Sequence, residues 1–195
     1  QSFLTHDEEL NGFKEYPTEI AEVASMSMEL FSMDHWKVFF DNEEELTRAK
    51  EQQLERVITI FPWIASIDKF QHWIYEHASH TAEMWTQAWQ EIYSSFTSPV
   101  IDWSEAADAK AALWQKQLHI FEVPFYYIEY GMAQLGAIAV WRNYKRNPQL
   151  AIEQYKNALS LGSTRSIPDV YRTAGIRFDF SEAYIRELAG FVMSE

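Results

Sequence analysis

Glycine and proline are rare in this sequence, and their scarcity is the feature that most limits its possible folds. The 195 residues include only six Gly and six Pro, while Ala, Leu, Glu, Gln and Met, which favour helices, are abundant. No stretch has the turn residues and the alternating pattern that are typical of a β-hairpin. The sequence therefore predicts an all-α protein with long helices and few tight turns.

The ends of the helices can be placed from capping residues and prolines. Pro17 and Thr18 predict the start of a first helix that reaches about Phe40, because proline is tolerated in a first turn and threonine caps well. Pro62 predicts the end, or a kink, of a second helix over about residues 43–60. Further helices are expected after caps at Thr81 and Asp102 and over residues 123–146. Another is expected from the cap Asn147 to a stop at Gly162, followed by two short helices after Pro168 and Ser181.

Length and charge limit the classes of protein that fit. A chain of 195 residues without a linker or a low-complexity segment is expected to form a single helical unit over residues 1–195. The net charge of −13 repels phosphate backbones and anionic lipids, so neither nucleic acid nor a membrane is expected as a partner. The sequence contains no signal-peptide pattern and no apolar run of about 18 residues, so a cytoplasmic location is the default expectation. The absence of cysteine excludes disulfides and thiolate metal sites.

The stretch EIAEVASMSMELF, residues 19–31, places two carboxylates on one helical face. Glu22 and Glu29 are two turns apart, and His35 is the one basic residue between positions 19 and 36. Because both sides of this helix are apolar or small, we expect it to be buried all round, where a carboxylate needs compensation. Two explanations remain open. Glu19 and Glu22 could complement the helix N-terminus while Glu29 pairs with a Lys or Arg, or the acids could face a metal.

Two common metal motifs are missing from the sequence. A di-iron bundle needs Glu-x-x-His on two helices, and none of the six histidines has a glutamate three residues before it. A self-contained zincin needs HExxH, and no histidine here is followed by glutamate. His77 and His80 have a spacing that could bind a metal, but a site needs further ligands, so we interpret them as surface histidines.

An aromatic cluster lies in HIFEVPFYYIEYG, residues 119–131. If the segment after Pro124 is helical, Tyr127 and Tyr130 share a face, with Tyr126 also close to Tyr130. Aromatic residues at helical spacing usually belong to a core. Three phenols and an imidazole would each need a hydrogen-bond partner if buried, however, and such groups could instead donate to an oxyanion.

Three blocks of the sequence carry a family resemblance. They are YPTEIAEVASMSMELF, HIFEVPFYYIEYGMAQLGAIAVW and YKNALSLGSTRSIPDVYRTAGIRFDF, in this order. Together they closely resemble the C-terminal part of the oligoendopeptidase F family, zinc oligopeptidases related to thimet oligopeptidase, and the resemblance spans essentially the whole chain. It implies an all-α part of a zincin-type catalytic domain that hydrolyses short peptides.

The resemblance also implies roles for individual residues. In that family an HExxH helix supplies two histidine ligands and the catalytic glutamate, and a glutamate on a later helix completes the zinc site. The family's EVAS motif places this later glutamate at Glu22, with Ser25 and Glu29 as neighbours that orient the site. His119 and Tyr130 match the residues that contact the substrate carbonyl and stabilise the tetrahedral intermediate. The substrate-binding residues implied are Tyr126, Tyr127, Gly162 and Ser163.

One departure from the family pattern changes the expected activity. HExxH is absent from the sequence, and it is expected just upstream of Gln1, because QSFLT resembles the family's residues directly after that motif. With one of the three protein ligands that catalytic zinc needs, the chain alone is expected to retain no zinc and to be inactive. The surface left by the missing segment is expected to favour self-association. The alternative function is a non-catalytic helical module that binds a peptide or protein helix in the Tyr-rich groove.

Overall fold

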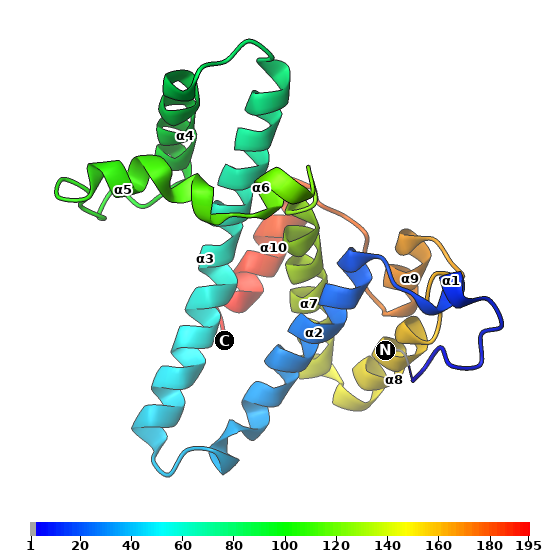
Figure 1. Cartoon of the computed structure of the whole chain (residues 1–195). Helices are drawn as coiled ribbons and strands as arrows, with labels where there is room; N and C mark the ends of the chain where they lie inside the picture. The colour runs from blue at the N-terminus through cyan, green and yellow to red at the C-terminus, as the bar shows by residue number, and fades with distance from the viewer. Residues whose placement is uncertain (1–2) are drawn as a thin grey trace. The chain divides into compact units, whose positions relative to one another are not determined.

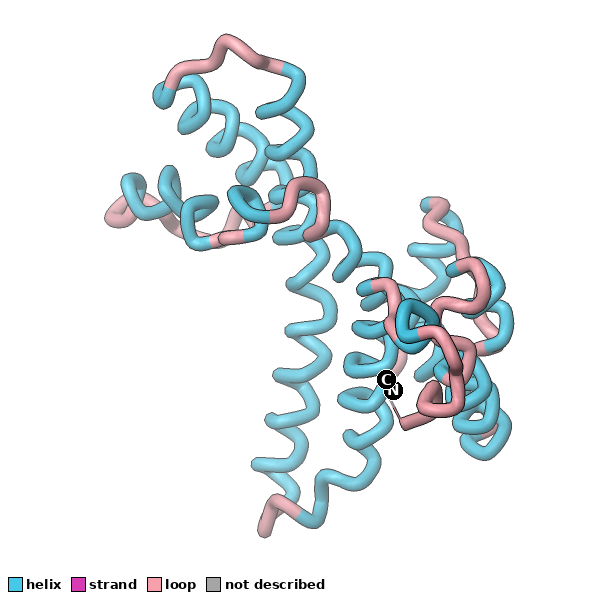
Figure 2. Tube along the Cα trace, turned by 45° about the vertical axis from the view of Figure 1, so that its right-hand side comes forward, coloured by secondary structure: helices cyan, strands magenta, loops and turns pink. Residues whose placement is uncertain are grey.

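The computed structural model describes residues 3–195, and every regular element in this range is a helix (Figures 1 and 2). The all-α prediction is therefore confirmed. The elements are α1 (Asn11–Lys14), α2 (Thr18–Ser32), the 3-10 helix η1 (Met33–Val38), α3 (Glu43–Glu76), α4 (Ala82–Phe96), α5 (Ala107–Ala112), the 3-10 helix η2 (Leu113–Lys116), α6 (His119–Glu122), α7 (Ile128–Arg146), α8 (Pro148–Leu159), α9 (Ile167–Thr173) and α10 (Glu182–Val192). No helix in the described range is long and apolar enough to cross a bilayer.

Contacts along the chain separate two compact units. Unit 1 comprises the residues up to 55 together with residues 132–195, and unit 2 comprises residues 56–131. The boundaries fall inside α3 and α7 rather than in loops. The sequence-based expectation of a single helical unit over residues 1–195 stays a prediction.

Several helix starts agree with the caps read from the sequence. Each cap places a side-chain oxygen near the backbone N–H three residues later, which satisfies a donor that has no partner within the helix. The pairs are Thr81 Oγ1 with the N–H of Met84 at 3.4 Å, Asn147 Oδ1 with that of Leu150 at 3.2 Å, and Ser181 Oγ with that of Tyr184 at 3.4 Å. A further contact of this kind, which was not predicted from the sequence, joins Asn42 Oδ1 and the N–H of Glu45 at 2.8 Å.

Of the two alternatives predicted at Pro62, an end or a kink, the helix end is wrong, because α3 continues to Glu76. Proline lacks an N–H and removes one helical hydrogen bond. The next turns, however, bury Ile64, Ile67 and Phe70 almost completely, and this packing outweighs the lost bond.

Two other boundaries differ from the prediction. The first helix ends at Ser32 and continues as η1 to Val38, short of the expected Phe40. Asp102 caps no helix, because its Oδ1 accepts the N–H of Ser104 at 2.9 Å in a local turn. The following helix, α5, starts only at Ala107.

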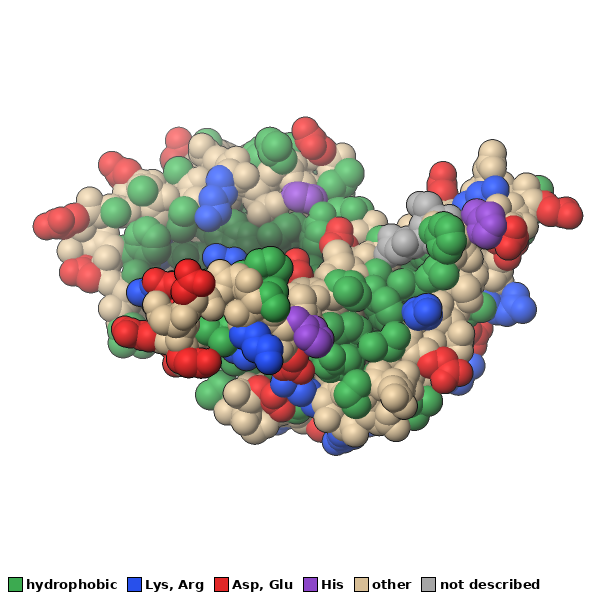
Figure 3. Space-filling view, turned by 90° about the horizontal axis from the view of Figure 1, so that it is seen from below, with side chains coloured by type: hydrophobic (Ala, Val, Ile, Leu, Met, Phe, Trp, Pro, Cys, Tyr) green, Lys and Arg blue, Asp and Glu red, His purple; other side chains and the backbone are tan. Residues whose placement is uncertain are grey.

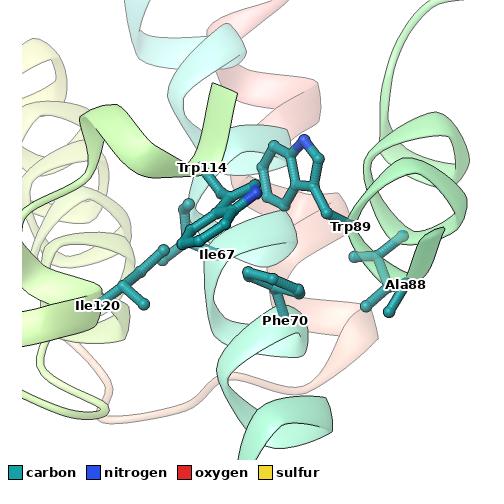
Figure 4. Close-up of a cluster of buried hydrophobic side chains, with 7 residues drawn as sticks. Ile67, Phe70, Ala88, Trp89, Trp114 and Ile120 are labelled. Carbon is teal, nitrogen blue, oxygen red and sulfur yellow. The ribbon is translucent and has the colours of Figure 1, made fainter. Parts of the chain in front are cut away.

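The core of unit 2 is mainly aromatic. Figure 4 shows side chains from α3, α4 and the segment from η2 to α6 turned toward one another. Phe70 lies with its ring centroid 5.4 Å from Trp89 and 5.6 Å from Trp114. The indole N–H of Trp89 donates to the Lys110 carbonyl at 2.9 Å, so this buried polar group is satisfied.

Unit 1 is built around α7, which is buried continuously from Ala133 to Trp141. A glycine in α7 allows α2 and α9 to approach it closely. A Cβ at Gly136 would lie 2.8 Å from Cγ2 of Val23 in α2 and 3.1 Å from the hydroxyl of Tyr171 in α9. A side chain at this position would therefore force α2 and α9 away from α7.

Candidate functional site

The helix α2 has one buried and one open face, so the expectation that it is buried all round is wrong. Its buried residues are Ile20, Val23, Ala24, Ser27, Leu30 and Phe31. This stripe follows the spacing of three and four residues that turns one side of a helix to a core. On the opposite side Glu22 is half-buried, and Ser25 and Glu29 are exposed.

Glu22 interacts with its own helix. The hydroxyl of Ser25 lies 2.7 Å from Oε2 of Glu22 and 3.1 Å from its carbonyl oxygen. Within residues 3–195 Glu22 forms no ion pair. Its carboxylate charge is therefore not neutralised by any Lys, Arg or His of the described chain.

Glu29 has a neutral partner. The amide of Gln53 in α3 donates to Oε2 of Glu29 at 3.2 Å. The cationic partner considered for this residue is not found among the described Lys and Arg side chains. An exposed carboxylate is hydrated and needs no such partner, which explains the difference.

The Glu22 carboxylate is not part of a complete metal site within the described residues. No cluster of three or more His, Cys, Asp or Glu that could hold a metal occurs in the range 3–195. The Glu22 carboxylate, which forms no ion pair within residues 3–195, has the chemistry of a single oxygen ligand.

His77 and His80 lie against tryptophans. The His77 ring stacks on Trp73 with centroids 4.5 Å apart, and the His80 ring stacks on Trp85 at 4.8 Å. Each Nδ1 lies within hydrogen-bond distance of a backbone carbonyl, 2.8 Å for His77 and 2.6 Å for His80. Their surroundings are thus aromatic rings and backbone rather than further metal ligands.

The structure brings the predicted substrate-contact residues of unit 2 together. The ring of His119, the first residue of α6, lies between three tyrosines, with centroid distances of 5.7 Å to Tyr126, 5.1 Å to Tyr127 and 5.7 Å to Tyr130. The Tyr127 and Tyr130 rings are 5.4 Å apart. One imidazole and three phenols thus form a compact group, which we call the His119 cluster.

A turn, rather than the expected helix, positions two of these tyrosines. Helix α7 begins at Ile128 instead of about residue 123. Phe125 adopts φ 60°, a left-handed conformation that is rare for a bulky residue. Such strained positions concentrate at functional sites. The reversal of the chain at Phe125 places Tyr126 and Tyr127 next to His119.

Two residues that the sequence did not indicate complete this arrangement. Gln117 Nε2 lies 2.5 Å from Nδ1 of His119, and the indole N–H of Trp63 donates to Gln117 Oε1 at 3.1 Å. Burial raises the pKa of the Tyr127 phenol, and a hydrogen bond with Trp63 opposes part of this shift. Trp63 lies 54 residues before Gln117, so no local pattern in the sequence could have linked them.

Gly162 and Ser163 contact the N-terminal segment of unit 1. Gly162 has φ 52°, and a Cβ there would lie 2.1 Å from the Phe13 carbonyl oxygen. The Ser163 N–H donates to the same oxygen at 3.1 Å, and its hydroxyl donates to the Glu15 carbonyl at 2.7 Å. The structure thus gives this loop a role in holding residues 13–15, while its assignment as a substrate loop stays a prediction.

Unit 1 also has an apolar cavity of about 480 Å³. It is lined by Met28, Phe31, Ser32, His35, Phe39, Tyr144, Ile152, Tyr155 and Lys156. Figure 3 views the end of the molecule where α2 is joined to α3, and hydrophobic side chains gather on this face among acidic and basic ones. Phe39 and Val38 are 78% and 72% exposed.

One family of known proteins matches nearly the whole chain. The model of peptidase family M3 matches residues 1–190. The chain belongs to peptidase family M3. The resemblance to oligoendopeptidase F is thereby confirmed at the level of the family. No curated protein matches the chain.

Solved structures support the membership in family M3. PZ peptidase A, determined with an inhibitor, is 26% identical with a TM-score of 0.88, and the match covers 100% of this chain and 35% of that one. A candidate oligoendopeptidase F from Bacillus anthracis is 25% identical with a TM-score of 0.74, over 100% of this chain and 32% of that one. Another candidate oligoendopeptidase F shows the likeness of fold alone. It is 24% identical with a TM-score of 0.85, over 99% of this chain and 34% of that one. The chain spans about a third of the length of these structures.

Proposed function

We propose that this chain is the C-terminal portion of the catalytic domain of a zinc-dependent metalloendopeptidase that hydrolyses short peptides. Membership in family M3 supports peptidase chemistry. The likeness to PZ peptidase A covers the whole of this chain and includes both of its compact units. The proposal assigns Glu22 to zinc binding and the His119 cluster to the substrate.

The observation that carries the proposal is the state of the Glu22 carboxylate. A glutamate on a half-buried helical position usually finds a cation or complements a helix terminus. Glu22 does neither, because it lies beyond the first turn of α2 and forms no ion pair within residues 3–195. Its contact with Ser25 restricts one oxygen, as expected of a carboxylate held ready for a metal.

In the proposed mechanism, Glu22 and Ser25 act at the zinc, and the His119 cluster acts on the substrate. Glu22 would be one ligand of the zinc, which would polarise the scissile carbonyl and activate a water molecule. Ser25 holds the orientation of the Glu22 carboxylate. His119 and Tyr130 donate hydrogen bonds to the oxygen that becomes negative in the tetrahedral intermediate, which lowers the barrier because the donors are already in place. Tyr126 and Tyr127, which belong to the same cluster as His119, contact the peptide.

The proposal includes a negative result for the 195-residue chain alone. Its sequence contains no HExxH, and a single carboxylate cannot retain zinc at ordinary concentrations. Calorimetric titration should detect no tight stoichiometric zinc site at neutral pH, and the chain should not hydrolyse peptides. A submicromolar site that disappears in Glu22→Ala would contradict the assignment of the remaining ligands to another segment.

The decisive experiment uses the full-length product of the gene that encodes this chain. Bound zinc is quantified by elemental analysis, and hydrolysis is measured on a mixture of short peptides. Glu22→Gln should abolish both, whereas Glu51→Gln, an exposed acid on α3, should change neither. Retention of zinc and activity in Glu22→Gln would overturn the proposal. A full-length wild-type protein without zinc or hydrolysis would instead favour the alternative, a non-catalytic helical module that binds peptides.

A further inference from the structure

We propose that Gln117, held by Trp63, is a positioning residue that fixes the proton of neutral His119 on Nε2. The inference rests on the proposed function only for its catalytic consequence. The hydrogen-bond chain itself lies within unit 2 and runs from the Trp63 indole through the Gln117 amide to the His119 ring. It can therefore be tested without any peptidase activity.

The first link sets the orientation of the Gln117 amide. An indole N–H can only donate a hydrogen bond, so the atom 3.1 Å from Trp63 Nε1 must be an acceptor. On Gln117 the acceptor is Oε1, because the amide nitrogen has no free lone pair. A flipped amide would place two donors against each other. Trp63 therefore directs Nε2 of Gln117 toward His119.

The second link sets the tautomer of His119. The Gln117 NH₂ group is a donor only, and it lies 2.5 Å from Nδ1 of His119. Nδ1 must accept this hydrogen bond with its lone pair. In a neutral imidazole the single proton then resides on Nε2, which becomes the donor of the ring. Nε2 forms no hydrogen bond with any residue in the described range.

Packing keeps the first donor of this chain in place. The Trp63 ring meets Trp89 edge to face at 5.7 Å and Tyr93 at 6.1 Å, and the Lys116 ammonium lies 4.3 Å above it. An indole held on several sides loses little further freedom when its N–H donates. The hydrogen-bond chain thus starts from a rigid part of the aromatic core.

The tautomer matters for the proposed chemistry. A ring that donates from Nε2 can hydrogen-bond the developing oxyanion, whereas the Nδ1–H tautomer presents a lone pair that would repel it. Removal of one oxyanion donor typically costs about 100-fold or more in kcat. Gln117 would therefore affect the rate without contacting the substrate.

The test begins with nitrogen NMR of the histidines in the 195-residue chain, recorded at about pH 8.5, where an ordinary imidazole is neutral. His119→Gln identifies the signals of His119. In the wild type, Nδ1 should resonate in the unprotonated range and Nε2 in the protonated range. Gln117→Glu keeps the shape and still accepts from Trp63, but its carboxylate needs a donor, so the proton should move to Nδ1.

Two further variants make the result interpretable. Trp63→Phe removes the donor that orients the amide, and both tautomers should then be populated. Gln115→Glu adds the same charge at an exposed site two residues away and should leave the wild-type pattern. A wild-type Nδ1–H tautomer, or an unchanged pattern in both Gln117→Glu and Trp63→Phe, would overturn the proposal.

The steady-state kinetics of the full-length protein provide a second readout. In Gln117→Glu, the neutral His119 ring carries its proton on Nδ1 and no longer donates from Nε2. The kcat of this variant should therefore fall by about 100-fold, with KM little changed.

The two proposals fail in different ways. An Nε2–H tautomer in the 195-residue chain, together with an inactive full-length wild type, would contradict the proposed peptidase function. The proposed role of the hydrogen-bond chain from Trp63 to His119 would be unaffected. A wild-type Nδ1–H tautomer in an active enzyme would contradict only the proposed role of Gln117. An unchanged kcat of Gln117→Glu in an active enzyme would show that Gln117 does not act through the tautomer.

Discussion

The hydroxyl of Ser25 lies 2.7 Å from Oε2 of Glu22, one helical turn earlier in α2. Because both residues belong to the same helix, this contact does not depend on any other segment of the chain. Where a carboxylate binds a metal, partners of this kind typically contribute about 10-fold to 100-fold to the metal affinity. The contact therefore allows a graded test of the proposed ligand, milder than removal of Glu22 itself.

We expect Ser25→Ala to weaken zinc binding in the full-length protein by about 10-fold, because the Glu22 carboxylate loses the donor that restricts it. Competition with a chelator measures this change. Ser160→Ala, which removes an exposed hydroxyl at the end of α8, is the matched control and should leave the affinity unchanged. An unchanged affinity in Ser25→Ala would argue against Glu22 as a ligand.

Tyr155 should make the stability of the chain depend on alkaline pH. Its hydroxyl donates to the Ala24 carbonyl at 2.9 Å, and burial raises its pKa to about 12. A phenol whose pKa is higher in the folded than in the unfolded state stabilises the fold. This contribution is fully present below the unfolded pKa of about 10, and it is lost as pH rises toward 12.

Urea unfolding between pH 9.5 and about 12 measures the effect. The wild type should lose stability more steeply than Tyr155→Phe, by less than the limit of about 1.4 kcal/mol per pH unit for one proton, since Tyr155 is only half-buried. Tyr75→Phe, at an exposed phenol, should follow the wild type. Parallel curves for wild type and Tyr155→Phe would refute the assigned shift.

Two helical glycines should respond to alanine in opposite directions. Gly136→Ala would bring a methyl group to 2.8 Å from the stiff, branched Val23 side chain, and the overpacking should cost about 1–3 kcal/mol. Gly190→Ala in α10 meets nothing within 4 Å and should stabilise by about 0.5–1 kcal/mol through helix propensity. Denaturant melts of both variants test this, and stabilisation by Gly136→Ala would mean that α2 and α7 pack less closely.

Ser163 should hold the N-terminal segment in place. Its hydroxyl donates to the Glu15 carbonyl, so Ser163→Ala should raise the rate of proteolysis within residues 3–16 several-fold, while Ser194→Ala should not. Mass spectrometry of limited digests locates the cuts. If Ser163→Ala leaves this rate unchanged but lowers peptide hydrolysis in the full-length protein, the residue belongs to the substrate loop instead.

The exposed apolar face of unit 1 should cause the 195-residue chain to self-associate. Val38 and Phe39 lie largely in solvent beside the apolar cavity, and exposed apolar patches of this kind favour association. Phe39→Glu should shift sedimentation toward monomer, whereas Val100→Glu, at an apolar residue that is 86% exposed in a loop of unit 2, should not. A clean wild-type monomer across concentration would contradict this expectation.

Much of the fold can be predicted from local patterns. The sequence predicts helix starts at Thr81, Asn147 and Ser181, because each side chain caps a backbone N–H only three residues later. The scarcity of turn residues predicted the all-α class. The His119 cluster was predictable in part, since its members lie within a dozen residues of one another.

Long-range packing accounts for the remainder. Helix α3 continues through Pro62 because the turns beyond it bury Ile64, Ile67 and Phe70, and such burial outweighs a local preference. The open face of Glu22 and the link from Trp63 to Gln117 likewise depend on which segments meet in space. Helix caps can be predicted from the sequence because a cap acts within one turn. Burial and long-range side-chain hydrogen bonds depend on residues that come together only in the folded protein.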